Sequence, residues 1–378
     1  MNQENSQKDS KKDSQKDILF INSGSYGCVF NSEIPCSSNK GHNKHDEKKY
    51  VSKLTVISDK HNDDNEKMIG KLVKNIQHYE YYFAPILSTC PINIGVIDDE
   101  EIEKCDVIAK SKTKSEKTNI PSIYVTNKMR FVGDDTITQY LETNINNQET
   151  KKIFETHLHL MKALDKLNSL PESIIHYDLK SDNIMFDTIQ NVPIIIDFGL
   201  SFTHTKMFDA LLKPENLRSI FYNDQSYSPW SIEIQLLSFI TINIVSNDED
   251  IDNIFVQKYL DDFYRVLIYF INAKSNLTVF DSKDDKNQFE RKIIDYITSF
   301  KHKTIKEFIH DLMSSWKSWD NYSIAVMYKT YIFKKDELLT DPYIVKYKDL
   351  IKTIILALPS ERINSLETYH SILKLCRE

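Results

Sequence analysis

The chain has 378 residues, a formal net charge of -7 and a hydrophobic content of 40%, with aromatic residues at 11%. This composition supports a packed core and excludes wholesale disorder, and the negative charge gives no reason to expect binding to nucleic acid. No apolar run approaches the roughly 18 residues that a membrane span needs, and no signal peptide precedes the first predicted strand.

Five cysteines are scattered through the sequence without paired spacing, at Cys28, Cys36, Cys90, Cys105 and Cys376. They are therefore predicted to be reduced thiols, as in an intracellular protein. Since neither a membrane span nor a leader is visible, we expect a soluble protein located in the cytoplasm.

Residues 1–17 contain almost no apolar side chains and are predicted to be a disordered tail. A strand is predicted at 18–21, and two glycines, Gly24 and Gly27, follow it before the next apolar run. Such a pair suits a tight turn whose backbone N–H groups can approach phosphates, although a glycine-containing hairpin is usually only a hairpin. A polar insertion is predicted at 32–49.

The next strand, predicted at 50–56, contains Lys53, and the helix predicted at 63–79 contains Glu66 on its apolar face. A carboxylate on an apolar face requires a cation, and Lys53 is the predicted partner. The alternative is that Glu66 only interacts favourably with the dipole of its helix.

Several further elements are predicted before the middle of the chain. Strands are expected at 81–87 and 92–97, a charged insertion at 98–119, and a strand from 120 that runs into a connector at about 128–132. A helix is predicted at 147–167 from its broad apolar face. The apolar, aromatic-rich stretches between 234 and 357 predict a region made mainly of helices.

The stretch from 174 to 200 has the most informative pattern. Two short apolar runs separated by a polar break predict a small hairpin, which would carry Asn183 and Asp197 on neighbouring loops that face the same pocket as Asp178. Asn183 and Asp197 offer the hard oxygen ligands that Mg²⁺ prefers. Asp178 would orient a substrate hydroxyl, and Lys180 would balance charge on a transferring phosphoryl group. The alternative is a buried hairpin with chance polar residues.

This ordered pattern, His-x-Asp-x-Lys-x-x-Asn followed by Asp-Phe-Gly, resembles the catalytic loop and the metal loop of eukaryotic-type protein kinases. The resemblance implies an α+β, bilobal kinase-like fold with a small β-rich lobe at 18–132 and a larger α-rich lobe at 133–378. It also implies ATP and Mg²⁺ as cofactors and a protein as the phosphate acceptor.

The resemblance extends to the nucleotide site. The segment with two glycines resembles the kinase glycine-rich loop, which assigns five cofactor-binding residues: Asn22, Gly24, Ser25, Gly27 and Val29. Lys53 resembles the strand lysine that holds the ATP α- and β-phosphates, and Glu66 its ion-pair partner. Met129 is assigned to the hinge that binds adenine, and Asn22 departs from the family, which usually has glycine there.

Other departures concern the large lobe. Tyr177 replaces the arginine that normally receives a phosphorylated activation loop, so we hypothesise that activity is set by constitutive ordering or by a partner. No Asp or Gly is recognised at the positions that the family uses to brace the catalytic loop. The segment up to Glu233 resembles an activation segment closed by a degenerate Ala-Pro-Glu motif, with Pro229 or Glu233 at the closing position. Arg362 resembles the late arginine that pairs with the glutamate of this motif, which predicts an Arg362–Glu233 ion pair.

Asp178-Leu179-Lys180 resembles the Ser/Thr type, which predicts transfer of the ATP γ-phosphoryl group to Ser/Thr hydroxyls of proteins. Small-molecule kinases of the aminoglycoside and choline type share part of the motif but usually lack this lysine and Asp-Phe-Gly. A pseudokinase acting as a binding scaffold is the alternative without catalysis. The low glycine content and the Pro-Trp dipeptide at 229–230 resemble divergent kinases of large DNA viruses, which would imply host cytoplasm or virion.

Overall fold

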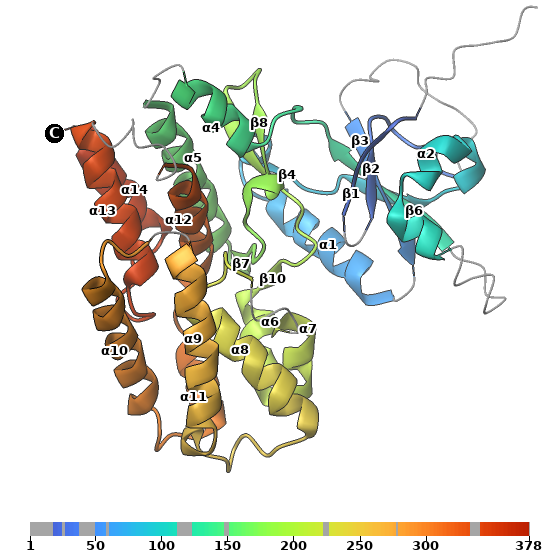
Figure 1. Cartoon of the computed structure of the whole chain (residues 1–378). Helices are drawn as coiled ribbons and strands as arrows, with labels where there is room; N and C mark the ends of the chain where they lie inside the picture. Colours follow the sequence, from blue (N-terminus) through green and yellow to red (C-terminus); the bar gives the residue numbers. More distant parts are fainter. Residues whose placement is uncertain are drawn as a thin grey trace, which may run out of the picture. The chain divides into compact units, whose positions relative to one another are not determined.

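The computed structural model describes residues 18–24, 27–37, 50–57, 60–111, 123–146, 151–221, 227–276, 279–332 and 341–377. The chain forms two compact units, Met1–Lys67 with Ile86–Phe131 and Met68–Pro85 with Val132–Glu378. The first is built on a β-sheet and the second is mostly helical (Figure 1), so the fold is mixed α+β and consistent with a kinase-like fold. The expected tail at 1–17 lies outside the described residues.

The first unit contains a five-stranded sheet in the order β1-β2-β3-β6-β5, and all neighbouring strands are antiparallel. The strands are β1 (Phe20–Ser23), β2 (Cys28–Phe30), β3 (Tyr50–Ile57), β5 (Ser88–Pro91) and β6 (Ile123–Arg130). Val29 lies opposite both Asn22 and Lys53, so the turn with two glycines and the lysine strand are adjacent in the sheet.

Two segments of this unit differ from the sequence-based prediction. The strand expected at 92–97 is instead the 3-10 turn η2 (Ile94–Val96), because Asn93 caps it by accepting from the backbone N–H of Gly95. The charged insertion expected at 98–119 contains a helix, α2 (Asp99–Glu103), which Asp98 caps and which buries Ile102. A single apolar residue among acidic residues gives no helical periodicity, so this helix could not be predicted from the sequence.

The prediction of reduced cysteines is wrong for four of the five. Cys28 is bonded to Cys105, with Cα atoms 5.9 Å apart, and Cys36 is bonded to Cys90, with Cα atoms 5.6 Å apart. The paired residues are 77 and 54 positions apart in the sequence, so only the folding of the first unit brings them together. Cys376 is exposed and is the free cysteine. A cytoplasmic location stays a prediction, and it loses the support of reduced thiols.

The second unit is a large helical body. The boundary between the units falls inside α1 (Lys60–Val73), after Lys67. The longer helices of the second unit that follow are α4 (Ile137–Asn146), α5 (Lys151–Asn168), α8 (Ile232–Asn243), α9 (Leu260–Asn276), α10 (Lys283–Ser299), α11 (Ile305–Met313), α12 (Trp319–Ile332), α13 (Pro342–Leu356) and α14 (Ser365–Leu375). Figure 1 shows them gathered into one bundle, in which α5 packs against α14 and α8 against α9. None of the described helices is both long and apolar enough to cross a membrane.

The segment 68–85, which the sequence assigned to the small lobe, packs in the second unit because Ile69, Val73 and Phe83 are buried in its core. The helix expected to reach residue 79 ends at Val73, and a left-handed backbone at His78 leads into the short turn η1 (Tyr79–Tyr81).

The second unit also contains two small sheets, whose strands flank the polar loops described in the next subsection. Their strands are β4 (Phe83–Ala84), β7 (Ile174–Ile175), β8 (Ile184–Asp187), β9 (Val192–Ile196) and β10 (Phe202–Thr203). One sheet has the order β4-β9-β8 and the other pairs β7 with β10.

Candidate active site

The small sheets hold two polar loops next to each other, the first loop at 176–183 and the second loop at 197–199. β8 and β9 form the predicted hairpin, and Ile184 lies opposite Ile195, so Asn183 and Asp197 leave the hairpin at the same end. The pairing of β7 with β10 joins the chain before the first loop to the chain after the second. Asp187 closes the hairpin by accepting from backbone N–H groups in the turn.

A buried aspartate that the sequence reading missed braces the first loop. Both carboxylate oxygens of Asp320, at the start of α12, accept from the backbone N–H groups of His176 and Tyr177, at 2.8 and 2.9 Å. Burial raises the pKa of Asp320, and nearby His176 and the two backbone donors oppose that shift. The statement that no Asp braces this loop is therefore wrong. The Trp-Asp pair at 319–320 was the available signal, but it lies about 140 residues from the loop.

The carboxylate of Asp178 lies at the centre of a cluster of donors. Its Oδ2 accepts from Lys180 Nζ at 3.0 Å and from Asn183 Nδ2 at 2.9 Å, while Oδ1 accepts from the Tyr227 hydroxyl at 3.0 Å. Asn183 also donates to the backbone carbonyl of Asp178. The structure thus brings Asp178, Lys180 and Asn183 together, as expected, and adds Tyr227. Two fixed donors on Oδ2 set the orientation of the carboxylate.

The second loop carries Asp197 in a left-handed backbone conformation, with φ of 59°, and Tyr177 in the first loop has φ of 71°. Such conformations are costly for residues other than glycine and concentrate at functional sites. Asp197 Oδ1 accepts from the backbone N–H of Gly199, and Phe198 is buried against Phe83 and His176. The packing of the phenylalanine therefore holds the neighbouring carboxylate in place.

The residues at the hairpin end fit a magnesium ion. Asn183 uses its side-chain nitrogen on Asp178, which leaves its amide oxygen for a cation, and Asp197 supplies a carboxylate. The described residues contain no group of three or more His, Cys, Asp or Glu that could hold a metal by themselves. Mg²⁺ usually takes one or two protein oxygens and completes its shell with water and substrate phosphates, so this small donor set is suitable.

Tyr177 lies among aromatic side chains. Its side chain is buried and packs against Phe202 and Trp230, with ring centroids 5.1 and 4.9 Å away. The indole N–H of Trp230 donates to the Tyr177 carbonyl at 2.8 Å. Apolar packing of this kind needs no phosphorylation, so the contact is in keeping with the hypothesis of constitutive ordering.

In the first unit, Lys53 and Glu66 form the expected ion pair, with Lys53 Nζ 3.4 Å from Glu66 Oε2. Both side chains are buried, which favours pairing over solvent exposure. Lys53 therefore does not point into water, the arrangement that would have contradicted its assignment.

The described ends of the turn with two glycines lie close together. The N–H of Gly24 donates to the carbonyl of Gly27 at 2.8 Å. A Cβ at Gly27 would lie 2.5 Å from the Leu54 carbonyl oxygen, so no larger residue fits there. Asn22 is exposed and accepts from the N–H of Ser23, Val29 is half-buried, and Ser25 lies outside the described residues.

The connector begins later than expected. β6 extends to Arg130, and Met129 pairs with Val51 inside the sheet. Lys128 is also part of this strand, and its side chain contacts Glu33 at 2.6 Å. The role of Met129 in binding adenine stays a prediction, as do the roles of the other assigned residues.

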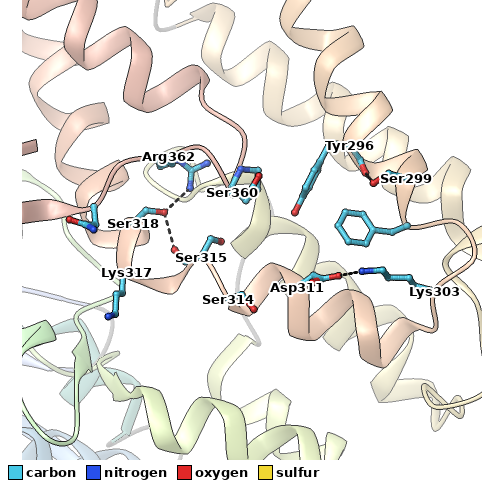
Figure 2. A pocket seen from close by; sticks show the side chains of 13 residues that line it. Tyr296, Ser299, Lys303, Asp311, Ser314, Ser315, Lys317, Ser318, Ser360 and Arg362 are labelled. Atoms are coloured by element: carbon cyan, nitrogen blue, oxygen red, sulfur yellow. Dashed lines mark hydrogen bonds and ion pairs between the residues drawn. The ribbon is translucent and has the colours of Figure 1, made fainter. Parts of the chain in front are cut away.

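The predicted Arg362–Glu233 pair is confirmed. Arg362 Nη2 donates to Glu233 Oε2 at 3.1 Å, Nη1 donates to Oε1, and both side chains are fully buried. Figure 2 shows Arg362 beside a pocket of about 530 Å³ in the second unit. In its lining, the Ser315 hydroxyl donates to the Leu312 carbonyl and the Ser318 hydroxyl donates to the Ser315 carbonyl. Lys303 forms an ion pair with Asp311. None of the sequence-predicted catalytic or metal residues lines this pocket.

Comparison with known proteins identifies the same central segment. Residues 131–211, which include Asp178, Asn183 and Asp197, match the model of a family described as the phosphotransferase enzyme family.

Similar proteins occur in Dictyostelium discoideum. The probable serine/threonine-protein kinase samkC is 45% identical over 69 residues, covering 18% of this chain and 7% of that protein. The probable inactive serine/threonine-protein kinase samkD is 35% identical over 92 residues, covering 24% and 15%. The EKC/KEOPS complex subunit bud32 is 28% identical over 112 residues, covering 28% and 43%. The chain thus spans less than half of each relative, and the expected viral origin finds no support among them.

Proposed function

We propose, from the premise that the central segment is that of the protein kinase-like superfamily of phosphotransferases, that this chain transfers the γ-phosphoryl group of ATP to Ser/Thr hydroxyls of proteins. The single observation that supports catalysis most is the ordered donor cluster on Asp178. Protein acceptors are favoured by Lys180 and by the Asp-Phe-Gly sequence at 197–199.

In this mechanism Asp178 accepts the proton of the acceptor hydroxyl as the new O–P bond forms and the bond from the γ-phosphorus to ADP breaks. Lys180, 3.0 Å from Asp178, supplies a positive charge next to the transferring group. Asn183 and Asp197 would hold Mg²⁺, which when bound neutralises phosphate charge. Lys53 would hold the α- and β-phosphates of ATP.

The test is turnover of radiolabelled ATP with casein by the full chain and by Asp178→Asn. Loss of the general base should lower kcat by about 100-fold or more. Asp284→Asn removes an exposed carboxylate on α10 and should leave the rate unchanged. Asp197→Ala should abolish turnover because a magnesium ligand is lost. Equal rates for the wild type and Asp178→Asn would refute the site assignment.

A small-molecule acceptor is the second candidate, because the matched family model is of phosphotransferases in general. Parallel assays with an aminoglycoside and with choline separate the two acceptor classes. Asp178-dependent labelling of these alcohols, without labelling of casein, would favour the second candidate. Turnover absent with every acceptor would favour the scaffold alternative, in keeping with the relative described as inactive.

A further inference from the structure

The carboxylate oxygen that an acceptor would use is occupied by a side chain of the chain itself. Oδ2 of Asp178 carries the donors from Lys180 and Asn183, which leaves Oδ1 as the oxygen for an acceptor alcohol. Among the described residues, Tyr227 is the one side chain that donates to Oδ1, at 3.0 Å. Its neutral O–H group contacts the carboxylate in the way that a substrate hydroxyl would.

The surroundings of Tyr227 keep this hydroxyl protonated. Burial, and after it the negative charge of Asp178, raises the pKa of Tyr227 well above its usual range. The ring lies edge-to-face with Trp230, at a centroid distance of 4.9 Å, and Lys180 Nζ is 5.9 Å from the ring centroid. The side chain is half-buried, so it is held in place but retains a solvent-facing side.

The backbone behind Tyr227 is fixed from several helices. The Ser228 carbonyl accepts from Lys274 Nζ of α9 at 2.6 Å, and the Pro229 carbonyl accepts from Ser323 Oγ of α12 at 2.9 Å. Gln235 of α8 donates to the Tyr227 carbonyl. Lys274 is fully buried, so this support is part of the core of the second unit. The fold therefore presents the Tyr227 hydroxyl to Asp178, and rotation of the side chain would withdraw it.

We propose that the Tyr227 hydroxyl is a built-in competitor for the acceptor position on Asp178, which an acceptor alcohol must displace before phosphoryl transfer. This inference rests on the proposed function and adds the residue that limits access of the acceptor. It holds for protein and small-molecule acceptors alike, because both must reach the same oxygen.

The size of the effect follows from the strength of one hydrogen bond. A hydrogen bond to a charged group changes an equilibrium by about tenfold or more. Only the molecules in which Tyr227 has turned away accept the alcohol. The apparent affinity for the acceptor is therefore the intrinsic affinity multiplied by the fraction of such molecules. Removal of the hydroxyl should therefore lower the KM for the acceptor by about tenfold, while kcat is kept.

The experiment compares the full-length wild type with Tyr227→Phe, which keeps the ring and its packing against Trp230. Initial rates are measured with ATP and Mg²⁺ while casein is varied, and ATP hydrolysis is measured without casein, where water is the acceptor. Tyr269→Phe is the matched control, because Tyr269 is 73% exposed on α9. Thermal unfolding of each variant checks that the fold is retained, and Tyr227→Ala repeats the test with the ring removed.

A roughly tenfold lower KM for casein and faster ATP hydrolysis in Tyr227→Phe, with Tyr269→Phe unchanged, is the expected result. A lower kcat at unchanged KM would overturn the inference, because Tyr227 would then only orient Asp178. That outcome leaves the proposed function intact, since turnover still depends on Asp178. Turnover seen in Tyr227→Phe alone, and abolished again by adding Asp178→Asn, would support both. No turnover in any variant would refute the proposed function and this inference with it.

Discussion

The two predicted ion pairs, one in each unit, are both buried but differ in how they are built. Arg362 and Glu233 meet through two N–H···O bonds, with side chains exposed by only 1% and 0%. Lys53 and Glu66 are 3.4 Å apart and keep 10% and 8% exposure. The arginine fork matches a carboxylate rigidly, whereas a lysine is a compact charge that adapts to other anions.

The difference fits a structural role for the Arg362–Glu233 pair and the proposed ATP-binding role for Lys53. Arg362–Glu233 joins positions 129 residues apart and connects the first turn of α8 to the segment before α14. Lys53–Glu66 joins β3 to α1 within the first unit, 13 residues apart, and holds an ammonium group where the sequence pattern expects a phosphate. We therefore expect loss of the first pair to affect mainly stability, and loss of the second to affect mainly activity.

The largest effect on stability is expected for Arg362→Leu. Glu233 would stay buried without its partner, which costs about 3–5 kcal/mol in the free energy of unfolding. Urea denaturation measures this loss, and Arg377→Leu, at an exposed position, is the matched control. The double variant Arg362→Leu/Glu233→Leu should recover much of the loss, because no uncompensated charge remains. A single variant as stable as the control would contradict the structural role.

A smaller loss of stability is expected for Lys53→Met. Glu66 loses a partner but keeps some access to water, so the cost is about 1–3 kcal/mol. Phosphotransfer should nevertheless fall below detection, because the cation that would hold the ATP phosphates is gone. Lys71→Met, at an exposed position of α1, serves as control in both assays. Retained activity in Lys53→Met would place the functional cation elsewhere.

The smallest expected effect is on the pH dependence of the stability of the second unit. Burial lowers the pKa of His157 in α5 to about 3, so the folded chain binds fewer protons than the unfolded chain between that pH and the ordinary histidine value of 6.5. The stability of the second unit should therefore fall as the pH drops from about 6.5 to about 3 and should be insensitive to this group above 6.5. His157→Gln should flatten this slope in acid denaturation followed by fluorescence. An unchanged slope would assign acid sensitivity to other groups.

The sequence predicted much of the candidate site because its residues are local. Asp178, Lys180 and Asn183 lie within six residues of one another, and the hairpin fixes Asp197 near them. The Lys53–Glu66 pair was predictable because a carboxylate on an apolar helix face requires a cation, whereas the Arg362–Glu233 pair was predicted from the resemblance to the kinase family. Asp320 and Tyr227 escaped detection, since a lone Asp in a helix and a Tyr in an irregular segment carry no periodic pattern.

By itself the sequence determined the order of most elements, the polar loops at 176–183 and 197–199, and the need for a cation beside Glu66. Only the tertiary structure decided what contacts those loops from a distance: the Asp320 brace, the Tyr227 hydroxyl on Asp178, and the two disulfides in the first unit. The physical reason is that hydrophobic periodicity specifies which face of an element is buried, while partners that lie 49 to 144 residues apart are chosen by how those faces pack.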